Sequence, residues 1–176
     1  MLRPRIRKTV LVIHIAVSVA LAGEVWGLVA LNTAAALTKD GELAHAAYRL
    51  MPVLVFAGGI PLSLTALISG ITLGLGGHWG LFRYYWVTAK LVLLVAVICT
   101  GMFLFDPAGM AEATAGGGAA GAGRQWGQVA VPGTQLAMLL AATALSVFKP
   151  RGSRRGDAPR PGGTVKNLAD PQEKHK

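Results

Sequence analysis

The sequence predicts an all-α protein, a transmembrane four-helix bundle followed by a basic tail. Of the 176 residues, 53% are hydrophobic and 14% are charged, against roughly 25% charged residues in ordinary soluble domains. Four apolar runs also approach the roughly 20 residues that a helix needs to cross a bilayer. Because a bilayer leaves no water to pair the backbone and the alternation of a barrel strand is absent, helices are expected. The composition argues against a soluble globular protein.

The four expected spans make up one membrane domain, residues 1–149. They lie at residues 10–31, 50–75, 84–105 and 129–148. The remaining segment, residues 150–176, is rich in proline, glycine and charge and cannot bury a core, so we expect a disordered tail.

Basic residues gather at the two ends of the chain and predict its orientation. Of the 17 Lys and Arg residues, four precede the first span and eight follow the last. With the N-terminus inside, the inner side also holds Arg83, whereas the outer side holds Lys39, Arg49 and Arg124. The positive-inside rule therefore predicts a multi-pass protein of the bacterial inner membrane with both termini in the cytoplasm. This distribution of charge argues against nucleic acid as a partner. It predicts that the basic tail binds anionic lipid headgroups.

The first span has a competing interpretation as a cleaved signal peptide. It has a basic start, an apolar core and a small-x-small site at Ala20-Leu21-Ala22. Apolar residues resume after Glu24 and continue to Leu37, which makes the run longer than a signal core. This length favours an uncleaved anchor.

Small residues recur in three of the spans and are expected at the helix contacts, because transmembrane helices pack closely at small side chains. They are Ala16, Ala20, Gly23 and Gly27 in the first span, Ala66, Gly70 and Gly74 in the second, and Gly133, Ala137 and Ala141 in the fourth. Pro61 and Pro132 are expected to kink their helices.

The outer segment between the third and fourth spans begins at Asp106-Pro107 and contains a glycine-rich stretch, residues 116–123. It lacks the Gly-Lys-Ser/Thr of a phosphate loop, and no strand precedes it. We interpret it as a flexible linker.

Ionisable residues inside the spans are the candidates for chemistry, because a charge at mid-bilayer costs about 2.5 to 3.5 kcal/mol on insertion scales. They are His14, Glu24 and Lys90. His14 and Lys90 each follow the cytoplasmic start of a span by a few residues, so they are expected at similar depth, as a polar pair in the inner half. Glu24 is about 15 Å farther out, at 1.5 Å per residue.

Each of these residues also has a structural interpretation. His14 can be a neutral imidazole bonded to a neighbouring helix, through a residue such as Thr72. Lys90 can extend its ammonium to the headgroups. Glu24 can be a partly hydrated or protonated carboxyl in the bundle interior, with a proton relay as the alternative.

Metal binding has weaker support from the residues. His78 lies on the same side as His14, but His14 is the one histidine well inside a span, whereas a bis-histidine haem site needs two facing imidazoles. Cys99, the single cysteine, excludes an internal disulfide, and its spacing from the methionines shows no cuprous-ion pattern.

One segment resembles a known family. It runs from Ser69-Gly70 through Gly74-Leu75-Gly76, Trp79-Gly80-Leu81, Arg83-Tyr84 and Trp86-Val87 to Lys90-Leu91. It is similar to the signature of an uncharacterised family of four-span bacterial membrane proteins, frequent in actinobacteria. That family is distantly similar to copper-resistance D proteins and to haem-containing membrane protoporphyrinogen oxidases.

The resemblance covers roughly the first three spans and implies haem b as a cofactor. In the oxidases a first-span histidine ligates haem and a third-span lysine is needed for activity; His14 and Lys90 look like the corresponding positions. The oxidases' wider set of polar positions and a second buried histidine are missing, which speaks against the oxidase reaction.

Three functions follow from these residues. The first is a non-enzymatic membrane or accessory protein, which needs only packed helices and a basic tail. The second is a haem b protein with His14 as axial ligand and Lys90 near a propionate or substrate carboxylate. The third is a small proton-coupled or metal-handling transporter that uses Glu24 as an outer polar station. A homodimer or another membrane partner fits each of them.

Overall fold

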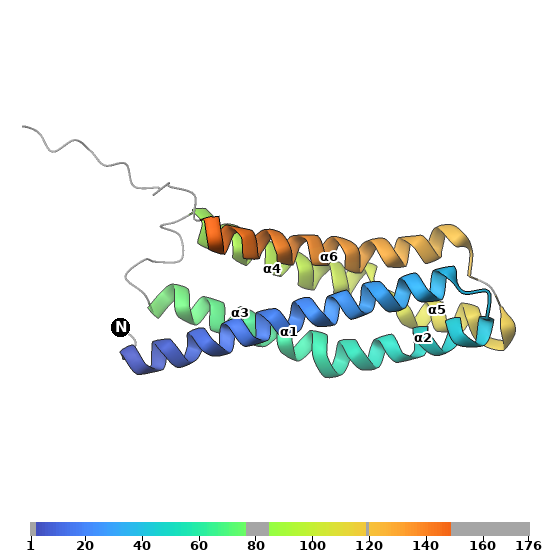
Figure 1. The fold of residues 1–176 in the computed structure, drawn as a ribbon, viewed down its shortest axis with the longest axis horizontal. Helices are drawn as coiled ribbons and strands as arrows, with labels where there is room; N and C mark the ends of the chain where they lie inside the picture. Colours follow the sequence, from blue (N-terminus) through green and yellow to red (C-terminus); the bar gives the residue numbers. More distant parts are fainter. Residues whose placement is uncertain (1–2, 77–84, 119, 149–176) are drawn as a thin grey trace, which may run out of the picture.

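The computed structural model describes residues 3–118 and 120–148 except for 77–84, and this part of the chain contains helices and no strand. The elements are α1 (Pro4–Leu37), α2 (Gly41–Leu54), the π-turn η1 (Val55–Gly59), α3 (Ile60–Gly76), α4 (Tyr85–Leu104), α5 (Pro107–Thr114), the 3₁₀ turn η2 (Ala115–Gly117) and α6 (Ala122–Phe148). Figure 1 shows that the long helices run side by side along one axis. The predicted basic tail and His78 lie outside the described residues.

Four helical segments are long and apolar enough to cross a membrane, which confirms the all-α class and indicates a multi-pass membrane protein. They are Pro4–Leu37, Gly41–Leu75, Trp86–Gly117 and Ala122–Phe148. The 34 residues of α1 correspond to about 51 Å at 1.5 Å per residue. This exceeds the roughly 30 Å of a hydrocarbon core, so the helices extend past the expected spans.

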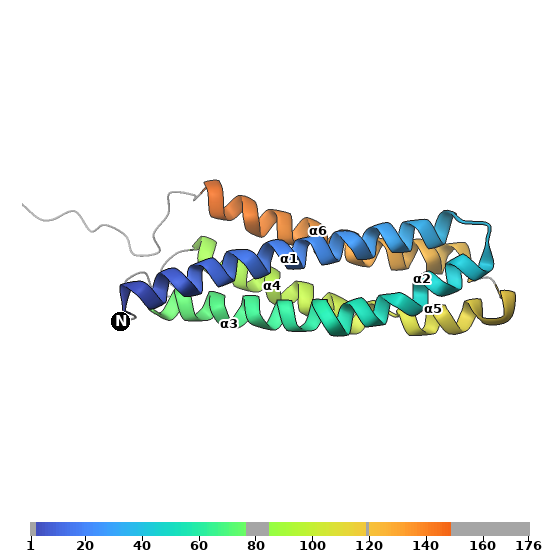
Figure 2. The same ribbon diagram turned by 60° about the horizontal axis from the view of Figure 1, so that its bottom comes forward.

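Helix α1 is central, because it packs along α3 on one side and along α6 on the other. Helix α4 packs along α6 and makes less contact with α3. We call the end of the bundle at which α1 begins the proximal end, and the end at which α1 stops at Leu37 the distal end. Figures 1 and 2 show that the last turns of α6 diverge from the start of α1, at the proximal end.

Most of the buried side chains lie toward the distal end. There α2 and α5 pack against each other, and α2 also packs against α1. The distal core consists of Leu28, Ala35, Ala44, Ala47, Tyr48, Met51, Met110 and Ala120. Tyr48, Met51 and Met110 are fully enclosed. In contrast, no residue of α1 before Leu21 and none of α6 after Gln135 is buried.

The buried face of α1 is formed by three branched residues, one amide and one alanine at helical spacing. They are Leu21, Val25, Leu28, Asn32 and Ala35. The predicted small-residue contacts of the first and fourth spans are therefore wrong. Ala16, Ala20, Gly23, Ala137 and Ala141 are exposed, and a Cβ at Gly23, Gly27 or Gly133 would meet open space.

On α3 the predicted contacts at Ala66 and Gly70 are confirmed, since Ala66 is buried and Gly70 lies against His14. Small residues allow close approach without forcing it, so the larger side chains on another face of α1 decide how that helix is rotated.

The predicted kink at Pro61 takes the form of the π-turn that joins α2 to α3. The Ile60 N–H donates to the Val55 carbonyl, five residues earlier. Pro61 has no N–H, and in an α-helix its ring would collide with the carbonyl of Ala57. The wider turn relieves this collision. Pro132, in contrast, is buried inside the continuous helix α6.

The segment after Asp106 is more ordered than the predicted linker. The Asp106 carboxylate caps α5 by accepting from the Gly109 N–H at 2.9 Å, and it forms an ion pair with Arg124 at 3.0 Å. The chain turns back at Gly116 and Gly117, whose φ angles of 65° and 80° favour glycine. The linker prediction is wrong for residues 107–114, because the N-cap at Asp106 starts helix α5 before the glycines begin.

Candidate functional site

His14 on α1 is held by α3. Its Nδ1 lies 2.9 Å from Ser69 Oγ. The Ser69 hydroxyl donates its one hydrogen to the Thr65 carbonyl at 2.6 Å, so it accepts a hydrogen bond from Nδ1–H. This assignment, made from the hydrogen-bond network, leaves the lone pair on Nε2. The Ala66 backbone also interacts with the His14 ring, and the side-chain hydrogen bond to Ser69 is made by Nδ1 and not by Nε2.

The face of α3 near His14 is shaped to receive the imidazole. A Cβ at Gly70 would lie 3.2 Å from His14 Cε1, so the glycine makes room for the ring. The predicted bond to a neighbouring helix is present, but the partner is Ser69. Thr72 instead donates to the Ile68 carbonyl within its own helix, at 2.7 Å.

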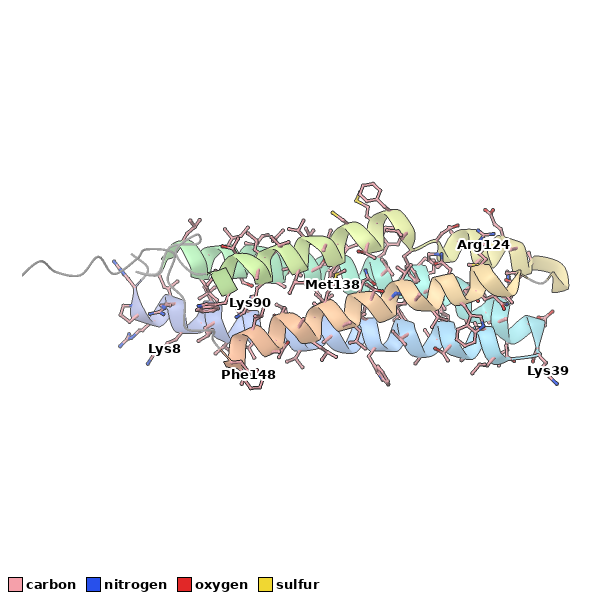
Figure 3. The ribbon with its side chains drawn as sticks, turned by 90° about the horizontal axis from the view of Figure 1, so that it is seen from above. Lys8, Lys39, Lys90, Arg124, Met138 and Phe148 are labelled. Carbon is pink, nitrogen blue, oxygen red and sulfur yellow. The ribbon has the colours of Figure 1, made fainter. Side chains whose placement is uncertain are left out.

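Lys90 enters the same region from α4. Its Nζ lies 4.6 Å from the centroid of the Trp86 ring, one turn earlier, in cation–π geometry. Figure 3 places Lys90 toward the proximal end. The ammonium is close enough to interact electrostatically with the His14 ring. Lys90 therefore acts on the His14 ring through its charge, although α1 and α4 make little direct contact in the described part of the chain.

Glu24 lies in a different layer, against the π-turn. A Cβ at Gly59 would lie 3.1 Å from Glu24 Oε1, and a Cβ at Gly58 would lie 3.3 Å from Cγ. The carboxyl group therefore rests directly on the turn. Its Oε1 is buried and has no hydrogen-bond partner in the described part of the chain.

Gln135 is a polar residue of the bundle interior that the sequence reasoning missed. Its Nε2 donates to the Val97 carbonyl on α4 at 2.9 Å, and a Cβ at Gly101 would lie only 2.8 Å from that nitrogen. The amide thus crosses α4 where a glycine leaves space. The sequence feature that could have identified Gln135 is an amide side chain inside an apolar run.

The distal end has a second set of polar contacts that the sequence reasoning missed. His45 Nδ1 lies 3.0 Å from the Ala111 carbonyl and 3.2 Å from Thr114 Oγ1, which links α2 to α5. Asn32 Nδ2 donates to the Leu28 carbonyl at 2.9 Å. Asn32 Oδ1 and Tyr48 Oη are buried without a partner among the described residues.

No group of three His, Cys, Asp or Glu side chains that could hold a metal ion occurs within the described ranges. No family model matches the chain, and comparison with curated proteins and with solved structures gives no match either. The resemblance of the segment between Ser69 and Leu91 to four-span membrane proteins stays a prediction.

Proposed function

We propose that this chain is a multi-pass protein of the bacterial inner membrane that catalyses no reaction and serves as an accessory component of a membrane process. The observation that carries the proposal is the use of polar side chains as ties between helices. His14 links α1 to α3, Gln135 links α6 to α4, and His45 links α2 to α5. Such bonds average about 0.6 kcal/mol in membrane proteins and reach about 1.7 kcal/mol. Three of the polar residues thus have a packing role.

Lipid is the expected environment of the outer face. Large apolar side chains point away from the bundle, including Phe56, Met102 and Phe103, which are 72%, 76% and 77% exposed. Water would disfavour so large an apolar surface. The distribution of Lys and Arg supports cytoplasmic termini, so the proximal end would face the cytoplasm.

Single-cysteine labelling in spheroplasts tests this orientation. In a Cys99→Ser background, Lys39→Cys is expected to react with a membrane-impermeant maleimide added outside. Arg5→Cys and Lys174→Cys are expected to react only after the membrane is permeabilised. The reverse pattern would overturn the orientation.

The accessory role is tested by the size of the native assembly. A tagged chain extracted from its own membrane in mild detergent is expected, in native mass spectrometry, to carry a stoichiometric protein partner. The same chain extracted from an unrelated bacterial host is the control. Recovery of this chain alone from its own membrane would contradict the role.

A haem b protein is the second candidate, and a specific observation favours it. Ser69 fixes the His14 ring through Nδ1 and leaves Nε2 available, which is the arrangement that orients a metal-ligating histidine. His14 would hold the haem iron, and Lys90 would hold a propionate. The bound haem would supply electron-transfer chemistry. The other histidine of the described residues, His45, is engaged at the distal end, so His14 is the one described histidine that would hold the iron.

An absorption spectrum separates the two candidates. The protein is expressed with haem supply, purified in detergent, and measured oxidised and dithionite-reduced beside His14→Ala. A stoichiometric Soret band that His14→Ala abolishes would establish haem binding. A colourless wild type that is helical by circular dichroism would remove haem and leave the accessory role.

A further inference from the structure

The contact between Glu24 and the π-turn is a feature that the proposed function does not use. Glu24 is ten residues beyond His14 on α1, well inside a membrane-spanning helix. Ionisable groups at such depth are costly and generally serve a purpose. In this structure the carboxyl group is in the bundle, with Oε1 shielded from solvent and unpartnered.

The charge of Glu24 is not balanced by a neighbouring cation. The ion pair of the described residues joins Arg124 to Asp106, elsewhere in the bundle. On α1 the next ionisable side chain inward is His14, which is bonded to α3, and α3 itself carries no ionisable residue. On α2 the nearest charged residue, Arg49, is exposed. An ionised carboxylate here would have no protein counter-ion among these groups.

The turn beneath the carboxyl group is short of hydrogen-bond donors. Pro61 has no N–H, so it donates neither to Ala57, its α-helical acceptor, nor to Phe56, its π-helical acceptor. Gly58 and Gly59 keep side chains away from this backbone, and the carboxyl group occupies the space they leave. The carboxyl group therefore lies against a turn in which the Phe56 and Ala57 carbonyls lack the hydrogen bond that an N–H at position 61 would donate.

We propose that Glu24 and the π-turn Val55–Gly59 form a binding site for one monovalent cation, H⁺ or Na⁺. Both ions neutralise a carboxylate. A bound proton lets the carboxyl group donate a hydrogen bond to a carbonyl oxygen, whereas Na⁺ is coordinated by carboxylate and carbonyl oxygens. Interrupted membrane helices present carbonyl oxygens to such ions in transporters, and π-turns occur frequently at functional sites. The site is independent of haem and of an accessory role.

Carbodiimide labelling tests the site, because dicyclohexylcarbodiimide modifies protonated carboxyl groups in apolar surroundings. The full-length protein in liposomes is treated over a pH series, and the adduct is located by peptide mass spectrometry. We expect modification at Glu24, with a rate that falls about tenfold per pH unit above its titration midpoint. Glu24→Gln should lose the adduct, and the exposed Glu42 and Glu112 serve as internal controls.

A second arm identifies the ion. At fixed pH, Na⁺ is compared with choline at equal ionic strength. Slower labelling in Na⁺ assigns a site that takes both ions, and equal labelling assigns a proton site. Absence of labelling at Glu24 at every pH, in both media, would overturn the proposal.

Two variants test whether the turn belongs to the site. Gly59→Ala places a methyl group against Oε1, and Pro61→Ala restores a backbone donor, so both should reduce labelling of Glu24 severalfold. Gly27→Ala, on α1 where a Cβ meets open space, is the matched control and should label as the wild type does. Circular dichroism checks that each variant is folded. Folded Gly59→Ala and Pro61→Ala proteins that label at the wild-type rate would overturn the role of the turn.

Discussion

The distal and proximal ends of this bundle are built differently. At the distal end, α2 and α5 add a second layer of contacts, and Tyr48, Met51 and Met110 are fully enclosed. At the proximal end, α6 diverges from α1 (Figure 2), and His14 is only half-buried. Residues that carry stability and residues that meet ligands tend to occupy different parts of a protein. The contrast teaches that His14 and Lys90, the candidate haem-binding residues, lie in the part of the bundle that contributes least to its core.

The largest expected effect is at the distal core. Met51→Ala should cost about 2 to 5 kcal/mol of unfolding free energy, because it leaves a cavity among enclosed side chains. Leu11→Ala, at an exposed position of the proximal half of α1, should change it by no more than about 0.5 kcal/mol. Thermal unfolding in detergent, followed by circular dichroism, measures both. Equal losses of unfolding free energy in Met51→Ala and Leu11→Ala would contradict the difference in packing between the two ends.

The second-largest expected effect is at the contact between α4 and α6. Gly101→Ala should cost about 1 to 3 kcal/mol, because its methyl group would overlap the Gln135 amide. Gly127→Ala, on α6 where a Cβ meets open space, is the control. Shortening the amide in Gly101→Ala/Gln135→Ala should recover part of the loss. A double variant less stable than Gly101→Ala would show that the overlap is not the cause.

The smallest effect concerns the proximal tie between α1 and α3. Ser69→Ala should cost about 0.6 kcal/mol, a typical interhelical hydrogen bond in a membrane, and Thr72→Ala should cost less because Thr72 bonds only within its helix. The same melting experiment compares them. If haem binds, Ser69→Ala should also weaken it, since the His14 ring would lose its orientation. A larger loss from Thr72→Ala would contradict the assigned partner.

The sequence predicts only part of the difference between the two ends. We predicted His14 and Lys90 at similar depth, and the Lys90 charge acts on the His14 ring in the fold. The predicted partner of His14 was a residue such as Thr72, whereas Ser69 fills that role. Sequence position fixes height along a helix to within about a turn, at 1.5 Å per residue. The direction in which a side chain points depends on how the helices are rotated.

The sequence by itself determined the helical class, the four apolar segments, the gathering of basic residues at the two ends of the chain and the ionisable residues within the apolar segments. Length, hydropathy and charge are properties of each segment alone, so no neighbour is needed to predict them.

Only the tertiary structure decided which faces meet. It turned Gly23 and Gly27 outward, set Gln135 over Gly101, and laid Glu24 on Gly59. The physical reason is that a membrane helix is apolar on both its lipid side and its protein side. Hydrophobicity therefore does not mark the buried face, and detailed packing with polar ties chooses it.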